Sequence, residues 1–119
     1  MALQHEKLIA WQRADDLFVT VHVTTRKYFP PEERFALTSQ IRRAEYSVPA
    51  NIVEGVARRS TRERAHFLNI SEASLAEVGY CLHVARKSVG YLDEETYAHL
   101  DVEVRKTAAP LVGLIRTNR

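Results

Sequence analysis

Histidine and carboxylate side chains of a helical chain could hold a pair of metal ions. Di-metal carboxylate bundles use two Glu-x-x-His motifs together with two further glutamates. One such motif runs from Glu63 to His66, and the sequence holds no second one. Glu63 also stands three residues after Ser60, where it would complete a capping box at a helix start. We therefore predict no metal site and keep a metalloenzyme as the weakest of three hypotheses.

A second candidate group combines an amide with carboxylates. Asn51 and Glu54 lie one helical turn apart and could act as general acid and base groups in a pocket. No nucleophile motif or phosphate loop accompanies them. The alternative is structural, since buried polar groups joined by hydrogen bonds can fix the register of packed helices. We favour a structural network of Asn51, Glu54 and Glu77, place Cys81 in the core or an interface, and predict no catalytic residue, no cofactor and no enzyme activity.

Arginines form the third group, and they hold the chain's surplus positive charge. Residues 42–64 contain 6 arginines and 3 glutamates, whereas residues 1–41 and 65–119 are close to neutral. Arginine is favoured where planar contacts to carboxylate or phosphate are made. The surplus fits either a solvated helix end with internal ion pairs or a phosphate-binding face. For the second reading, the candidate nucleic-acid contacts are Arg42, Arg43, Arg58, Arg59, Arg62 and Arg64.

Length and composition indicate one domain over residues 1–119. The chain has 45% hydrophobic and 27% charged residues, which is typical of a globular protein with one core. A single cysteine excludes a disulfide framework, and the first residues are charged too early for a signal peptide. No apolar run approaches the roughly 20 residues that span a bilayer. A cytoplasmic protein with no membrane partner is predicted.

The elements that must position these residues are helices. The pattern predicts a first helix over about 6–28, a second from 31–38 to 55–59 with Pro49 inside it, a third capped by Ser60, and a fourth capped at 93–95. The first helix carries an apolar stripe that we expect to face the core: Trp11, Ala14, Phe18, Val21, Thr25 and Tyr28. Short connections favour antiparallel neighbours, so we predict an all-α, up-down-up-down four-helix bundle.

One long segment carries a family resemblance. Residues 35–55, FALTSQIRRAEYSVPANIVEG, resemble the hallmark of the 23S ribosomal RNA intervening-sequence proteins. Shorter matches extend the resemblance over nearly the whole chain: Ala10-Trp11, residues 25–30, Phe67-Leu68, residues 74–77, 83–85 and 90–92. The resemblance implies an antiparallel four-helix bundle in a ring-like homopentamer. A similar protein is the accessory variability protein of diversity-generating retroelements, a pentamer whose basic surface contacts nucleic acid. No catalytic activity is implied.

Two further hypotheses follow from the charges and the resemblance. The leading one is a homo-oligomeric bundle that binds structured RNA or an RNA–DNA hybrid through phosphate contacts to the six arginines. The other is a protein–protein scaffold, with another protein as a candidate partner, whose arginines form intersubunit ion pairs with the acidic fourth helix. Substitution of the arginines separates them, because the first predicts weaker nucleic-acid binding and the second a less stable oligomer.

Overall fold

Four long helices make up most of the computed structural model, which describes residues 3–118. They are α1 (Ile9–Tyr28), α2 (Leu37–Ala57), α3 (Thr61–His83) and α4 (Glu94–Arg116). Three short helical turns lie between or before them: η1 (Gln4–Lys7), η2 (Pro31–Glu33) and the π-helical η3 (Val84–Ser88). No strand occurs among the described residues, and the prediction of an all-α chain with four helices is confirmed.

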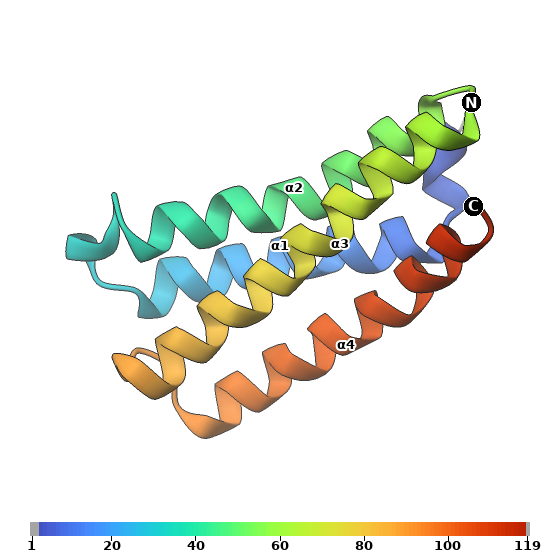
Figure 1. The fold of residues 1–119 in the computed structure, drawn as a ribbon. Coiled ribbons are helices and arrows are strands. Elements are labelled where there is room, and N and C mark those ends of the chain that lie inside the picture. Colours follow the sequence, from blue (N-terminus) through green and yellow to red (C-terminus); the bar gives the residue numbers. More distant parts are fainter. Residues whose placement is uncertain (1–2, 119) are drawn as a thin grey trace.

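The helices form a closed arrangement in which each one packs against the next. The contact between α2 and α3 is the most extensive, and α4 packs against both α3 and α1 (Figure 1). Both chain ends lie at one end of the elongated molecule, and the connection between α1 and α2 lies at the other (Figure 1). Within residues 3–118, no helix is long and apolar enough to cross a membrane.

Core packing follows helical spacing on α2, and on α1 it follows the predicted stripe for three of its six residues. Ile41, Val48 and Ile52 are almost completely buried, as the 3-4 spacing on α2 predicts. On α1 the buried line consists of Ala10, Ala14, Leu17, Val21 and Thr25. It keeps Ala14, Val21 and Thr25 of the expected stripe. Of the three rings in that stripe, Trp11 and Phe18 are only half-buried and Tyr28 is exposed. They therefore line the flank of α1 rather than the centre of the bundle.

The helix starts can be compared with the predicted capping residues and start positions. Ser60 accepts a hydrogen bond from the Glu63 backbone N–H at 3.0 Å, and Asp93 accepts one from the Thr96 N–H at 2.7 Å, so both predicted N-caps are confirmed. The first helix begins later than predicted, at Ile9, whereas the second begins at Leu37, within the predicted range of 31–38. Extended backbone at Leu8 separates η1 from α1, and Ala36 (φ −122°, ψ −107°) separates the proline-initiated turn η2 from α2.

Close packing of α2 on α3 depends on small residues at the contact. A Cβ at Gly55 would lie 3.3 Å from the Arg64 carbonyl oxygen and from the Leu68 side chain, which is tighter than ordinary contact. Ser71 is fully buried and donates a hydrogen bond of 2.7 Å to the Val48 carbonyl. This contact holds the arginine-bearing connection between α2 and α3 in a fixed position.

Candidate nucleic-acid interface

The structure divides the six predicted arginines into two groups. Arg58, Arg59, Arg62 and Arg64 lie at the connection between α2 and α3, hereafter the arginine corner. Arg42 and Arg43 stand on the first half of α2, 16 residues before Arg58 in the first case. At 1.5 Å per residue this is about 24 Å along the helix. The two groups therefore cannot contact the same phosphate.

Contacts with neighbours hold the arginine corner in place. The Arg58 guanidinium bonds the Glu54 carboxylate at 2.7 Å and lies over the Phe67 ring, 4.9 Å from its centroid. Arg64 Nε donates to the Arg58 carbonyl oxygen at 2.7 Å. Arg59 and Arg62 are exposed and form no ion pair with a described residue. Arg58 and Arg64 thus shape the corner, whereas Arg59 and Arg62 present free positive charge.

A surface hollow of about 570 Å³ opens at this corner. It is lined by Arg58, Ser60, Arg62, Glu63, His66 and Phe67. It lies beside the first turn of α3, whose unpaired backbone N–H groups and helix dipole favour negative charge. Sequence reasoning assigned Ser60 only a capping role and did not select Phe67; the available signal was their position two residues before and five residues after Arg62. Together these groups make a shallow site suited to an oxyanion such as phosphate.

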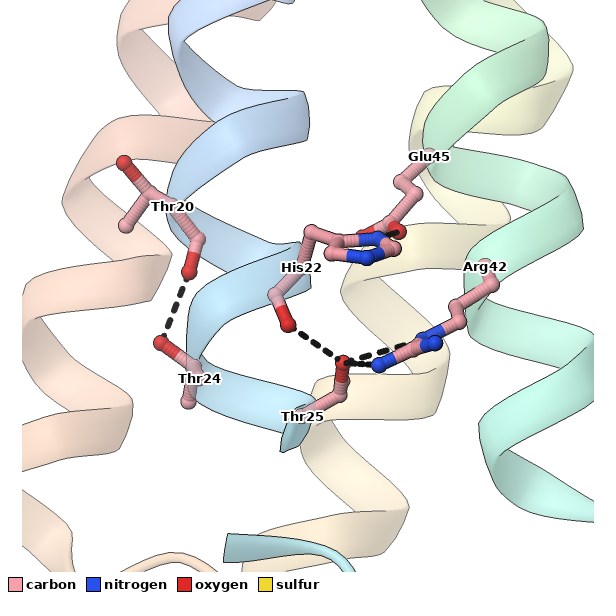
Figure 2. A network of polar contacts seen from close by, with 6 residues as sticks. All are labelled: Thr20, His22, Thr24, Thr25, Arg42 and Glu45. Atoms are coloured by element: carbon pink, nitrogen blue, oxygen red, sulfur yellow. Dashed lines mark hydrogen bonds and ion pairs between the residues drawn. The ribbon is translucent and has the colours of Figure 1, made fainter. Parts of the chain in front are cut away.

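Arg42 lies in a polar cluster between α1 and α2 (Figure 2). Its guanidinium donates to Thr25 Oγ1 at 3.4 Å through both Nε and Nη2. Beside it, His22 Nδ1 lies 3.0 Å from Glu45 Oε1. Figure 2 shows the imidazole and the Glu45 carboxyl next to each other, with the Arg42 side chain one turn of α2 away. Arg42 is half-buried here, so it is less accessible to a phosphate than Arg43, which is exposed.

Glu45 is the buried acid of this cluster, and sequence reasoning did not select it. Its side chain is completely buried, and Oε2 has no hydrogen-bond partner among the described residues. Burial raises the pKa of Glu45 to about 8, against the opposing effect of the Arg42 charge. Burial, and then the charges of Arg42 and Arg26, lower the pKa of His22. Both pKa shifts favour a protonated carboxyl that donates to a neutral imidazole near neutral pH.

A comparison with protein families supplies the relationship that geometry alone does not. The model of the family described as 23S rRNA-intervening sequence protein matches residues 6–113. The chain belongs to this family. The resemblance found in the sequence is thereby confirmed, and the match covers the first three helices of this intervening-sequence protein and all but the last three residues of α4. No curated protein matches the chain.

A solved structure supports the same fold. The intervening-sequence protein is similar to the crystal structure of a protein of unknown function from the S23 ribosomal protein family of Bacteroides thetaiotaomicron VPI-5482. The TM-score is 0.79 and the identity 22%, over 91% of this chain and 96% of that one. At this identity the likeness shows the fold alone, and it assigns no ligand to the arginine corner.

The predicted polar network is not assembled within one chain. Asn51 Nδ2 donates at 2.8 Å to the backbone oxygen and to Oγ of Ser47, and Ser74 Oγ donates to the same Oγ at 2.7 Å. Glu54 is exposed and pairs with Arg58, and Glu77 is exposed on α3. Among residues 3–118, no hydrogen bond joins Asn51, Glu54 and Glu77 to one another. The network that the structure shows is a seam of Asn51 and serines between α2 and α3.

The remaining candidate reactive groups are Cys81, Glu63 and His66. Cys81 is buried, and burial, followed by the nearby Glu77 charge, raises the pKa of its thiol to about 11, so it is unsuited to act as a nucleophile. Glu63 and His66 line the corner hollow, but within residues 3–118 no three histidine, cysteine or acidic side chains gather where they could hold a metal ion. The arginine corner is the arrangement with the clearest binding chemistry.

Proposed function

We propose that this intervening-sequence protein is a non-enzymatic, cytoplasmic accessory protein that binds nucleic acid by its phosphates at the arginine corner. The observation that carries the proposal is the hollow beside the α3 N-terminus, with Arg59 and Arg62 free of ion pairs. Guanidinium groups and helix N-termini both favour phosphate oxygens, and neither reads base identity. Structured RNA or an RNA–DNA hybrid is the preferred ligand class. Arg42 and Arg43 would extend the contact along α2.

Assembly is the second part of the proposal. We infer an antiparallel, up-down-up-down bundle that associates with itself as a homopentameric ring. Short connections and the position of both chain ends at one end of the molecule support the antiparallel order (Figure 1). Family membership supports the ring. A ring would repeat the corner once per subunit and raise affinity for a long ligand without new contacts in any subunit.

The test is a binding titration with a charge-matched control. Fluorescence anisotropy is measured with labelled structured RNA, duplex DNA and an RNA–DNA hybrid across a range of salt concentrations. The double variant Arg59→Ala with Arg62→Ala should weaken binding, and the slope of log K against log salt should fall by about 2 per engaged subunit. The control, Arg26→Ala with Arg34→Ala, removes the same charge near the connection between α1 and α2. Equal losses of binding affinity in the two double variants, or no loss in the Arg59 and Arg62 variant, would contradict the assignment of the site to the arginine corner.

A scaffold function is the second candidate, and exposed apolar side chains favour it. Val19 and Val23 on α1 are each 54% exposed and Val102 on α4 is 48% exposed, on helices that pack against each other. In this function the arginines would form ion pairs with acidic residues of another subunit or of a protein partner. Sedimentation velocity of the Arg59 and Arg62 double variant distinguishes the two, because the scaffold predicts a smaller assembly with nucleic-acid binding unaffected.

A further inference from the structure

A second hollow, of about 410 Å³, lies between α1 and α2. Residues one helical turn apart line it from both sides: Trp11, Asp15 and Phe18 on α1, and Tyr46, Pro49, Ala50, Val53 and Glu54 on α2. Three of the eight are aromatic and two are acidic. None is basic, so this site has the opposite charge preference to the arginine corner.

The aromatic rings form the apolar part of the site. Phe18 and Tyr46 meet edge to face across the two helices, with centroids 6.5 Å apart and an interplanar angle of 68°. Trp11 is braced by His5, whose ring centroid lies 4.7 Å away. Tyr46 nevertheless remains 64% exposed. Aromatic rings grouped at a surface hollow favour a flat or cationic group, because their faces carry negative electrostatic potential.

Asp15 is the polar group that points to a ligand. Its position between Trp11 and Phe18 on α1 leaves it half-buried, and it forms no hydrogen bond or ion pair with any residue in 3–118. Its carboxylate oxygens are therefore available to accept hydrogen bonds from a ligand in the hollow. Glu54, the other acid of the hollow, already pairs with the Arg58 guanidinium at 2.7 Å. The rim of the hollow thus accommodates an arginine–carboxylate pair at one end and leaves Asp15 unpaired.

We propose that this hollow binds an arginine side chain of a partner protein. A guanidinium can stack on an aromatic ring and donate two parallel hydrogen bonds to a carboxylate, whereas a lysine ammonium acts as a point charge and does not stack. Phosphate is disfavoured because Asp15 and Glu54 carry the same sign of charge as it does. The proposal does not depend on nucleic-acid binding at the arginine corner.

Continuity with a neighbouring hollow indicates that the arginine belongs to a polypeptide segment. That hollow is lined by Leu3, Gln4, His5, Val53, Val56 and Ala57, and it shares Val53 with the first. The combined trough follows α2 from Tyr46 to Ala57, which at 1.5 Å per residue is about 17 Å, or about three helical turns. Its walls beside the acidic positions are largely apolar, so a free amino acid would leave most of the trough empty. An amphipathic segment that places apolar side chains beside its arginine matches it in length and character.

Trp11 makes the site measurable, since it is the only tryptophan in the chain. The full-length protein, labelled with ¹⁵N, is titrated with the capped tripeptide acetyl-Gly-Arg-Gly-amide, and its Lys and Gln counterparts serve as comparison probes. We expect saturable shifts of the Trp11 indole N–H and of the amides around Tyr46 and Ala50 with the Arg peptide, weaker shifts with Lys and none with Gln. Asp15→Asn should weaken the Arg response about tenfold. The matched control is Asp16→Asn, at the exposed next position, and it should leave the response unchanged.

Three results would overturn the proposal. The first is an equal response to the Gln peptide, and the second is an Arg response that Asp15→Asn does not reduce. The third comes from sedimentation velocity: an oligomer that dissociates on Asp15→Asn would assign the hollow to a second copy of this chain. Tyr46→Ala, at an exposed ring, is a second variant should Asp15→Asn perturb folding, and circular dichroism checks both. Loss of RNA binding by the Arg59 and Arg62 variant leaves this result untouched, so the two proposals can fail separately.

Discussion

Replacement of Glu45 by Gln should stabilise the protein at neutral pH and remove much of its pH dependence. The side chain is completely buried, with Oε1 facing His22 Nδ1 at 3.0 Å and Oε2 without a partner among the described residues. Glutamine has nearly the same shape, and its amide can donate to His22 as the protonated carboxyl does. The variant therefore changes the titration of this position and leaves its packing in place.

The magnitude follows from the pKa of Glu45, which burial raises from 4.5 to about 8. The unfolded chain is ionised above pH 4.5, so folding takes up a proton, at a cost of about 1.4 kcal/mol per pH unit up to pH 8. The stability that protonated Glu45 contributes is fully present below pH 4.5 and is lost as the pH rises to about 8. His22 acts in the opposite direction, because its pKa is lowered and its contribution is lost as the pH falls below 6.5. Of this pair, only Glu45 contributes to the pH dependence of stability between pH 6.5 and 8.

The assay is urea unfolding followed by circular dichroism at several pH values from 5 to 8.5. Wild-type stability should fall with pH between 6.5 and 8, and Glu45→Gln should be flat there and more stable by about 3 kcal/mol at pH 7. Glu72→Gln, an exposed glutamate on α3, is the control and should follow the wild type. Parallel profiles for wild type and Glu45→Gln would refute the reasoning, since they would mean that Glu45 is ionised in the folded state and paired with His22.

Two further substitutions test the packing of the bundle by chemical unfolding. Gly55→Ala should cost about 1–2 kcal/mol because its Cβ would lie 3.3 Å from α3, whereas Gly113→Ala, with nothing within 4 Å, should stabilise α4 by up to about 1 kcal/mol. Equal effects would contradict the close approach of α2 and α3. Ser71→Ala should cost about 1 kcal/mol by removing the buried bond to the Val48 carbonyl, and Ser39→Ala, at an exposed position, should stay within about 0.5 kcal/mol of the wild type.

Helical periodicity predicted the fold class, and it failed where two apolar stripes compete on one helix. Trp11, Ala14 and Phe18 on α1 follow one another at 3-4 spacing. Ala10, Ala14 and Leu17 do so at 4-3 spacing. Both stripes satisfy the pattern, and only packing against α2 and α4 selects the second. The large rings are then left on the flank, where they line a hollow. The choice depends on the shape of neighbouring helices, which no local pattern contains.

The site residues were predictable to different degrees. Arg58, Arg59 and Arg62 lie within five positions of one another in the sequence, and the short connection between α2 and α3 keeps them together. The sequence also held a signal for Glu45, which lies four residues after Ile41 and three before Val48, on the buried stripe of α2. A charged residue at core spacing was overlooked because its partner, His22, is 23 positions away. Pairings between distant helices require the tertiary arrangement.

The charge of the arginine corner links the two parts of the proposed function, which are phosphate binding and assembly into a ring. Arg58 is paired with Glu54, Glu63 lines the same hollow and Arg64 is half-buried, so Arg59 and Arg62 supply most of the exposed positive charge at the corner of one subunit. Each phosphate contact contributes little on its own at physiological salt, and two contacts give only weak binding. Strong binding therefore requires several corners on one assembly, each engaging the same ligand. A dilution series that follows oligomer size and RNA binding together tests this link, because affinity should collapse at the concentration at which the assembly dissociates. RNA binding that persists unchanged in the monomer would show that binding does not depend on assembly. It would also require basic residues outside the arginine corner to contact the RNA.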